Sequence, residues 1–165
     1  MEQSPVRLNL GCGNKIREGW INVDFESNYS GKKPDVSCDL RKLPFPDNYA
    51  DEIEAVHVLE HFLPWETGEV LDEWIRVLKP SGTLAIEVPC FEKVMQAFVD
   101  KKATQAHWFA LYGDWRYGDE KMLHRWCFTR NQLLHLMGER LGNVREETAK
   151  YHVPSRDMRV VGGKS

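Results

Sequence analysis

The stretch VRLNLGCGNKIREGWINVD, from Val6 to Asp24, determines how the rest of the chain is interpreted. It predicts a strand over residues 6–10, a glycine turn at Gly11-Cys12-Gly13, and a second strand over residues 20–23 that ends at Asp24. Glycines let the backbone turn sharply and come close to a ligand. A carboxylate after the second strand can accept hydrogen bonds from two ribose hydroxyls. The stretch therefore indicates the entrance to a nucleotide site.

Two features separate this stretch from the dinucleotide-binding fingerprint. Ile16 occupies the position of the third glycine, and Asp24 follows Gly13 by only eleven positions, whereas the fingerprint places its acid about 20 residues further on. Glycine pairs also occur in plain turns, so the stretch alone leaves a nucleotide site and a turn without function both open. Residues 14–19 are too few for a regular helix. One face of the sheet is therefore expected to be thinly covered there.

The composition indicates a single soluble domain over residues 1–165. The chain has 42% hydrophobic and 28% charged residues, and its net charge of −3 disfavours a surface for duplex nucleic acid. The four cysteines lack a Cys-x-x-Cys spacing, which argues against a zinc knuckle or redox dithiol and favours a reduced, cytoplasmic protein. No apolar run approaches the roughly 18 residues of a membrane span, so no membrane association is expected. Nothing indicates an oligomeric state.

The remaining elements predict a largely parallel sheet that binds ligands at its carboxyl edge. Residues 26–33 read as a loop, and Ser81-Gly82 reads as a turn. Further strands are predicted over residues 36–38, 50–59, 83–88, 143–153 and 158–161, the last two as an antiparallel edge. Helices are predicted from Pro64 to no later than Lys79, over residues 91–102, and from a capping box at residues 129–132 to Gly142.

Aromatic side chains crowd residues 107–128. An aromatic lid over a pocket and a core that packs against the sheet both fit this composition. For Phe109 and Phe128 we expect core packing. Trp115 and Tyr117 flank glycines, and for them both interpretations stay open.

Six motifs in register resemble those of class I S-adenosylmethionine-dependent methyltransferases, in particular small proteins of the methyltransferase type 11 group, and the resemblance covers nearly the whole chain. The motifs are Leu8-Asn9-Leu10-Gly11-Cys12-Gly13, Asn22-Val23-Asp24, Cys38-Asp39-Leu40, Leu43-Pro44-Phe45-Pro46-Asp47, Val58-Leu59-Glu60-His61 and residues 76–84. The resemblance implies an α/β, Rossmann-like sheet, mostly parallel with an antiparallel C-terminal edge, in which the first helix is shortened or absent.

The resemblance also implies a set of residues for the cofactor, S-adenosyl-L-methionine. Gly11 and Gly13, with Asn9 and Cys12 in the same motif, would border its methionine part, and the backbone around His57 would face the methionine amino group. Asp24 would hold the ribose hydroxyls. Asp39 and the Leu40 amide would read the adenine, although an aspartate in this position also caps turns.

The candidate bases are His57, His61 and His124, with His107 as a weaker one, because histidine titrates near neutrality. A histidine near a strand end is also often a packed residue. His124-Arg125-Trp126 resembles the late His-x-x-Phe-type segment of the family. Nothing matches the Asn/Asp-Pro-Pro-Tyr/Phe motif of amino-group methyltransferases, so we expect an oxygen acceptor on a small molecule or a glycan.

Other interpretations are kept beside this one. His57-x-x-Glu60-His61 resembles the Glu-x-x-Glu-His of metal-assisted O-methyltransferases, but Leu-Glu-His is common in family members without a metal role, so no metal is expected. A histidine-rich set would suit zinc or iron better than magnesium. A non-catalytic cofactor-binding subunit that supports a partner protein, with the aromatic second half as its interface, is the main alternative. A nicotinamide dehydrogenase is a third, which the missing third glycine opposes.

Overall fold

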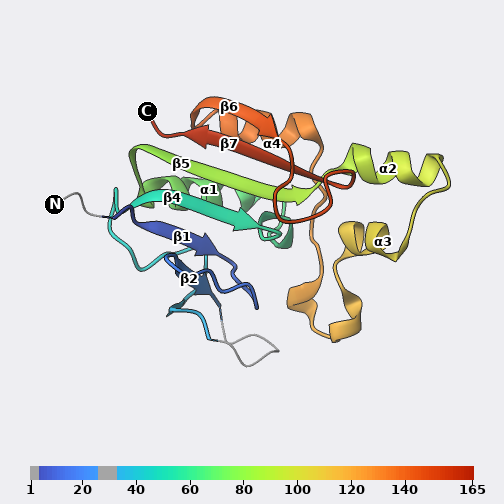
Figure 1. Cartoon of the computed structure of the whole chain (residues 1–165), viewed down its shortest axis with the longest axis horizontal. Coiled ribbons are helices and arrows are strands. Elements are labelled where there is room, and N and C mark those ends of the chain that lie inside the picture. Colours follow the sequence, from blue (N-terminus) through green and yellow to red (C-terminus); the bar gives the residue numbers. More distant parts are fainter. Residues whose placement is uncertain (1–3, 26–32) are drawn as a thin grey trace.

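A seven-stranded sheet with the order β3-β2-β1-β4-β5-β7-β6 organises the computed structural model, which describes residues 4–25 and 33–165 (Figure 1). Parallel pairing joins β1 to β2 and β4, β2 to β3, and β4 to β5, whereas β7 runs antiparallel to β5 and β6. The strands are β1 Arg7–Leu10, β2 Ile21–Asp24, β3 Val36–Ser37, β4 Ala50–Val56, β5 Leu78–Pro89, β6 Gly142–Glu147 and β7 Asp157–Gly163. The predicted α/β sheet with an antiparallel C-terminal edge is confirmed.

Two helices, α1 (Thr67–Val77) and α4 (Arg130–Gly138), lie behind the sheet in Figure 1 and cover one face. Their buried side chains, such as Trp74 and Met137, join the strand residues of a single core cluster. The apolar residues of α1 recur at helical spacing, as the sequence predicts, and so form one buried stripe. No helix within the described residues has the length and apolar character needed to cross a membrane.

The connection between β1 and β2 contains no helix, which confirms the shortened first crossover. Residues 11–20 form turns, and hydrogen bonds hold them against the sheet. The Asn9 amide donates to the Lys15 carbonyl (3.0 Å) and to Asn22 Oδ1 (2.9 Å), and Asn22 Oδ1 also accepts from the Arg17 amide (2.8 Å). Hydrogen bonds of two buried asparagines therefore hold this connection against the sheet, in place of a packed helix.

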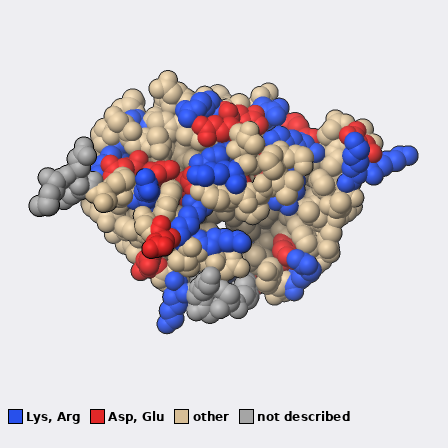
Figure 2. Space-filling model, in the orientation of Figure 1, with Lys and Arg blue, Asp and Glu red and all other residues tan. Residues whose placement is uncertain are grey.

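The second face of the sheet carries no helix among the described residues, and several charged side chains are buried on it. Glu54 on β4, Glu87 on β5 and Arg159 on β7 alternate with core residues along their strands. Residues 148–156 contribute to their cover, because the backbone amides of residues 150, 151 and 152 donate to the Glu87 carboxylate. Lys and Arg side chains gather over the middle of this face in Figure 2, which shows it in the orientation of Figure 1.

The remaining elements lie beyond the carboxyl ends of the parallel strands, to the right in Figure 1. They are the helices α2 (Phe91–Val99) and α3 (Gln105–Tyr112) and the 3-10 turns η2 (Trp115–Tyr117) and η3 (Glu120–Met122). A further 3-10 turn, η1 (Leu59–His61), follows β4. We call residues 105–122 the cap.

Several predicted boundaries are wrong by a few residues. The fourth strand ends at Val56 rather than at residue 59, because His57 takes a left-handed conformation (φ 55°) and η1 follows. The predicted turn at Ser81-Gly82 is instead an irregularity inside β5, where Ser81 has φ 64°. Helix α2 ends at Val99 rather than residue 102, and α4 ends at Gly138 rather than residue 142. The sixth strand stops at Glu147 because residues 148–156 leave the sheet to cover Glu87. Of the predicted loop over residues 26–33, only Lys33 lies within the described residues.

Candidate functional site

The glycine turn after β1 and the carboxylate after β2 meet at the carboxyl edge of the sheet. The Gly13 amide donates to Asp24 Oδ2 (2.7 Å), and the Phe25 amide donates to Asp24 Oδ1 (2.7 Å). These bonds fix the carboxylate and leave each oxygen with capacity for a further donor. The predicted residues Gly11, Gly13 and Asp24 are therefore brought together.

The two glycines of the turn have different surroundings. Both have positive φ, 62° at Gly11 and 49° at Gly13. A Cβ at Gly11 would lie 2.3 Å from Val58 Cγ2, whereas a Cβ at Gly13 would meet no described atom within 4 Å. Gly11 is thus required by packing against the segment after β4, and no described residue fills the space where a Cβ of Gly13 would lie, so a ligand could lie there.

Asn9 and Cys12 lie in the same motif but are buried, with 2% and 3% of their surface exposed. Asn9 holds the β1–β2 connection through the hydrogen bonds described above. Burial, together with the negative charges of Asp24 and Asp35, raises the pKa of the Cys12 thiol to about 12. Cys12 is therefore a protonated thiol at neutral pH, in a position to support the turn.

Asp39 follows β3 at the same edge, because the Cys38 amide donates to the Asp24 carbonyl (2.9 Å). Its carboxylate accepts from the Arg41 guanidinium (2.8 Å) and the Arg41 amide (2.9 Å), and the hydrogen bond from the Arg41 side chain lowers the pKa of Asp39. In this structure the Asp39 side chain therefore caps a turn, which is the alternative to a contact with adenine. The neighbouring Leu40 is buried, and its carbonyl accepts from the Trp74 indole (2.9 Å).

A cluster of histidines surrounds a buried glutamate at the end of β4. Glu60, whose side chain is 0% exposed, lies 3.2 Å from His57 (Oε1 to Nδ1) and 3.8 Å from His124 (Oε1 to Nε2). The His61 ring packs edge-on against the His124 ring, with centroids 4.8 Å apart. The structure therefore brings together all three predicted catalytic histidines, and His107 lies elsewhere, in the capping box of α3.

The electrostatics of the cluster differ from one histidine to the next. Burial alone would lower the pKa of His57, but the charge of Glu60 and the contact with Asp157 outweigh burial and raise it. Burial lowers the pKa of His124, and the charge of Glu60 offsets this only in part.

Sequence reasoning missed Asp157 and His152. Asp157 Oδ1 lies 3.5 Å from His57 Nε2, and the His152 and His57 ring centroids are 4.0 Å apart. One clue could have indicated Asp157: an antiparallel last strand begins at the edge where the parallel strands end, so a carboxylate at its start belongs to the site.

The cap and the residues that follow it are attached to both halves of this edge. Lys121 lies over the Phe25 ring at 4.6 Å, next to Asp24, and the Arg125 amide donates to the Glu60 carbonyl (2.7 Å). Trp115 and Tyr117 of η2 are about half exposed. Phe128 is buried, as predicted, whereas Phe109 is only partly buried beneath Trp115, so its assignment to the core is wrong.

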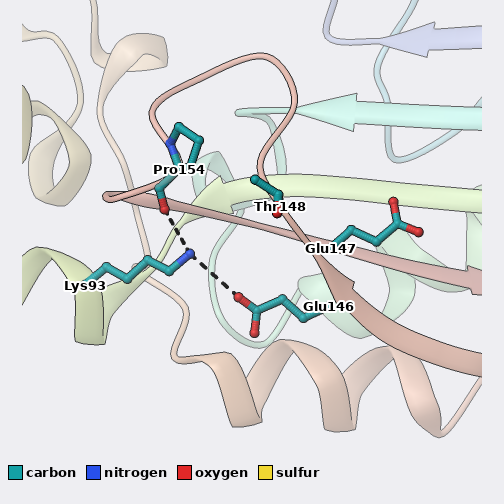
Figure 3. Close-up of a pocket in the computed structure, with 5 residues that line it drawn as sticks. All are labelled: Lys93, Glu146, Glu147, Thr148 and Pro154. Atoms are coloured by element: carbon teal, nitrogen blue, oxygen red, sulfur yellow. Dashed lines mark hydrogen bonds and ion pairs between the residues drawn. The ribbon is translucent and has the colours of Figure 1, made fainter.

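Two other hollows lie apart from these residues. The one in Figure 3 is lined by Lys93, Glu146, Glu147, Thr148 and Pro154. Lys93 Nζ lies 3.1 Å from the Pro154 carbonyl and 3.6 Å from Glu146 Oε1, while the Glu147 carboxylate points away. Its amine is already neutralised by the groups around it. The other hollow opens beside the helix-free β1–β2 connection, between Ile16 and Asp35.

Known proteins resemble this chain in sequence and in fold. Residues 8–86 match the model of a family described as a methyltransferase domain. A ubiquinone/menaquinone biosynthesis C-methyltransferase of Paraburkholderia phymatum is 40% identical over 53 residues, which are 32% of this chain. The match spans about a fifth of that relative's length (21%).

Two solved structures share the fold. One is a S-adenosylmethionine-dependent methyltransferase of Archaeoglobus fulgidus, with 17% identity, 97% of this chain and 86% of that chain covered, and a TM-score of 0.65. The other is a S-adenosylmethionine-dependent methyltransferase of Thermotoga maritima, with 16% identity, coverage of 100% and 84%, and a TM-score of 0.66. The family match therefore indicates a methyltransferase domain over residues 8–86, and the two solved structures show that the chain has the fold of S-adenosylmethionine-dependent methyltransferases.

Proposed function

We propose that this protein transfers a methyl group from S-adenosylmethionine to a small-molecule or sugar acceptor, with a hydroxyl oxygen as the favoured acceptor atom. The observation that carries the proposal is a juxtaposition. A glycine turn with an adjoining carboxylate and a cluster of partly buried histidines around the buried Glu60 lie at the same carboxyl edge, near the ends of the neighbouring strands β1, β2 and β4. Ligands of open α/β sheets bind in this position.

The residues at this edge fit the cofactor. The open space at Gly13 gives room for its methionine part, and Asp24 keeps lone pairs for the ribose hydroxyls beyond those that its two backbone donors use. Asp39 and the Leu40 amide would meet the adenine, with Asp39 held by Arg41. Asn9, Cys12 and Gly11 would support the turn, and the strained backbone at His57 would face the methionine amino group.

The three histidines are proposed as the groups that meet the acceptor. The bound cofactor supplies a sulfonium methyl, which needs alignment with a nucleophile more than activation. His61 Nδ1 lies 3.1 Å from the Leu123 carbonyl, and His124 Nδ1 lies 2.9 Å from the Ala110 carbonyl. We assign the N–H to Nδ1 in both rings from these contacts, so Nε2 carries the lone pair that can receive the proton of a hydroxyl.

Binding of the cofactor provides the first test. In isothermal titration with S-adenosylmethionine we expect a single site, and we expect Asp24→Ala to weaken it by about tenfold to a hundredfold, because charge-assisted hydrogen bonds are lost. Asp47→Ala is the matched control, since Asp47 is an exposed carboxylate that pairs with Arg76 outside the site. The proposal would be wrong if the wild-type protein showed no binding of S-adenosylmethionine at millimolar cofactor concentration.

A second candidate acceptor atom is carbon, because the matched Paraburkholderia relative is named as a C-methyltransferase. Turnover against one panel of hydroxyl acceptors and one of activated carbon acceptors separates an oxygen acceptor from a carbon acceptor.

The alternative function, a non-catalytic subunit that supports a partner protein, is supported by the exposed aromatic side chains of the cap. Full cofactor affinity with no turnover on either panel, together with stable co-purification of one protein, would favour that alternative.

A further inference from the structure

We propose that His57, Glu60 and His124 form a binding site for one divalent ion of the zinc or iron type, at the carboxyl end of β4. One ligand atom from each of the three lies within 4.8 Å of the other two. The proposal concerns ion binding alone and does not need the cofactor or turnover, so it goes beyond the proposed methyl transfer. With the ion bound, His57 and His124 are ligands, and His61 is the histidine whose lone pair stays available to the acceptor. It also replaces the ligand set that the sequence motif suggests, since His124 takes the place of His61.

The carboxylate of Glu60 is the first argument. It is fully buried, and no described residue donates a hydrogen bond to either of its oxygens. A buried ionised carboxylate is costly unless it is paired and hydrogen-bonded, or coordinates a metal. Its nearest positive candidates are the imidazoles of His57 and His124, which contact the same oxygen at 3.2 and 3.8 Å. An ion between the three residues would satisfy this carboxylate.

The orientation of the two imidazoles is the second argument. His124 turns Nδ1 to the Ala110 carbonyl (2.9 Å) and Nε2 to Glu60. His57 turns Nε2 to Asp157 Oδ1 (3.5 Å) and Nδ1 to Glu60. A metal-binding histidine presents one nitrogen to the ion and donates its other N–H to a carbonyl or carboxylate. His124 has this arrangement, and His57 comes near it, because its Nε2 lies 3.5 Å from the Asp157 carboxylate without a hydrogen bond. The two rings come from segments more than sixty residues apart in the chain.

The spacing and chemistry of the three ligands indicate the kind of ion. Ligands of a tetrahedral zinc ion lie about 3.4 Å apart, given bonds of about 2.1 Å. The 3.2 and 3.8 Å contacts already approach this spacing. Two imidazoles and one carboxylate suit zinc or non-haem iron rather than magnesium, which prefers oxygen ligands. Three protein ligands leave a position for water, as in catalytic rather than structural zinc sites.

The test uses the full chain, freed of metal by chelation and dialysed against Zn²⁺. We expect one equivalent of zinc per chain by elemental analysis, and its loss in Glu60→Gln and in His124→Ala. His135→Ala is the matched control and should keep the equivalent, because His135 lies on α4 with 79% of its side chain exposed. His61→Ala should keep it too. The Co²⁺-loaded protein should show the absorption of a nitrogen and oxygen site without thiolate bands.

Two outcomes would overturn the proposal. One is a wild-type chain that binds no zinc under these conditions, and the other is unchanged zinc binding in Glu60→Gln. Folding of each variant is checked by circular dichroism, and thermal unfolding gives a second readout: zinc should raise the Tm of the wild type and of His135→Ala, but not of His124→Ala. If the zinc experiment fails while titration still shows cofactor binding, the proposed function stands and only the ion site is lost.

Discussion

Arg159 on β7 donates to the carboxylate of Glu54 on β4, reaching across the intervening strand β5 on the face of the sheet that carries no described helix. Both side chains are buried, with 7% and 0% exposed. Arg17 from the β1–β2 connection and the Tyr151 hydroxyl (2.6 Å) bind the same carboxylate. Sheets of this class are normally covered by helices on both faces. Here a charged network holds the loops that replace part of one layer.

Removing Glu54 should therefore destabilise the fold. Glu54→Ala leaves the buried Arg159 with the more distant carboxylate of Glu147, at 3.7 Å, and breaking a buried pair in this way costs about 3 to 5 kcal/mol. We expect the free energy of unfolding in urea to fall by about that amount. Glu52→Ala is the control, since its pair with Arg7 is partly exposed and should be worth less than about 1 kcal/mol. Equal effects of the two substitutions would show that the network does not hold the face.

The same carboxylate should make the protein sensitive to acid. Burial would raise the pKa of Glu54, but hydrogen bonds from Tyr151 and Arg159 and the charges of Arg159 and Arg17 hold it below its ordinary value of 4.5. A depressed pKa contributes stability that is present above the ordinary value and is lost as the pH falls through the folded-state value. We expect the free energy of unfolding to decrease as the pH falls from about 6 to about 3. The decrease should be smaller in Glu54→Gln, and an unchanged slope in that variant would contradict the assignment.

Most strands along the chain and the glycine–aspartate edge could be predicted because they follow from local patterns. Apolar runs, the turn at Gly11-Cys12-Gly13 and the early Asp24 each depend on neighbouring residues alone. The short spacing after Gly13 also predicted that no helix follows β1, since six residues cannot form three turns. The histidine cluster was predicted in part, because His57 and His61 share a motif and His124 was matched to a later segment.

The charged face could not be predicted from neighbouring residues, because it depends on pairing across strands. The apolar residues of the predicted strand over residues 50–59 indicate a buried strand and give Glu54 no role of its own, although Glu52 and Glu54 alternate with Ile53 and Ala55 in the way that a two-faced strand does. Its partner Arg159 is 105 positions further on. The role of Asp157 likewise depends on the direction of the last strand, which only the assembled sheet determines.

The two glycines of the β1 turn should respond differently to substitution. Gly11→Ala should lower stability, because its Cβ would meet Val58 Cγ2 at 2.3 Å in a left-handed backbone. Val58→Ala should partly restore the fold in the double variant, and a strictly additive loss would contradict this cause. Gly13→Ala should cost only about 1 kcal/mol of backbone strain while weakening cofactor binding, because its Cβ enters the open space at the turn. Urea unfolding and isothermal titration measure the two effects separately.

The cysteines should react with alkylating reagents in an order set by their surroundings. Thiolate is the reactive form, and burial with neighbouring carboxylates raises the pKa of Cys12 and of Cys127 to about 12. Burial also raises the pKa of Cys38, but to a smaller extent, and its side chain is partly exposed. At neutral pH we therefore expect iodoacetamide to modify Cys38 before Cys12 and Cys127, as followed by peptide mass spectrometry. In urea the three sites should react at similar rates. Early modification of Cys12 in the native protein would mean that the glycine turn opens more often than its hydrogen bonds to Asp24 and Val23 imply.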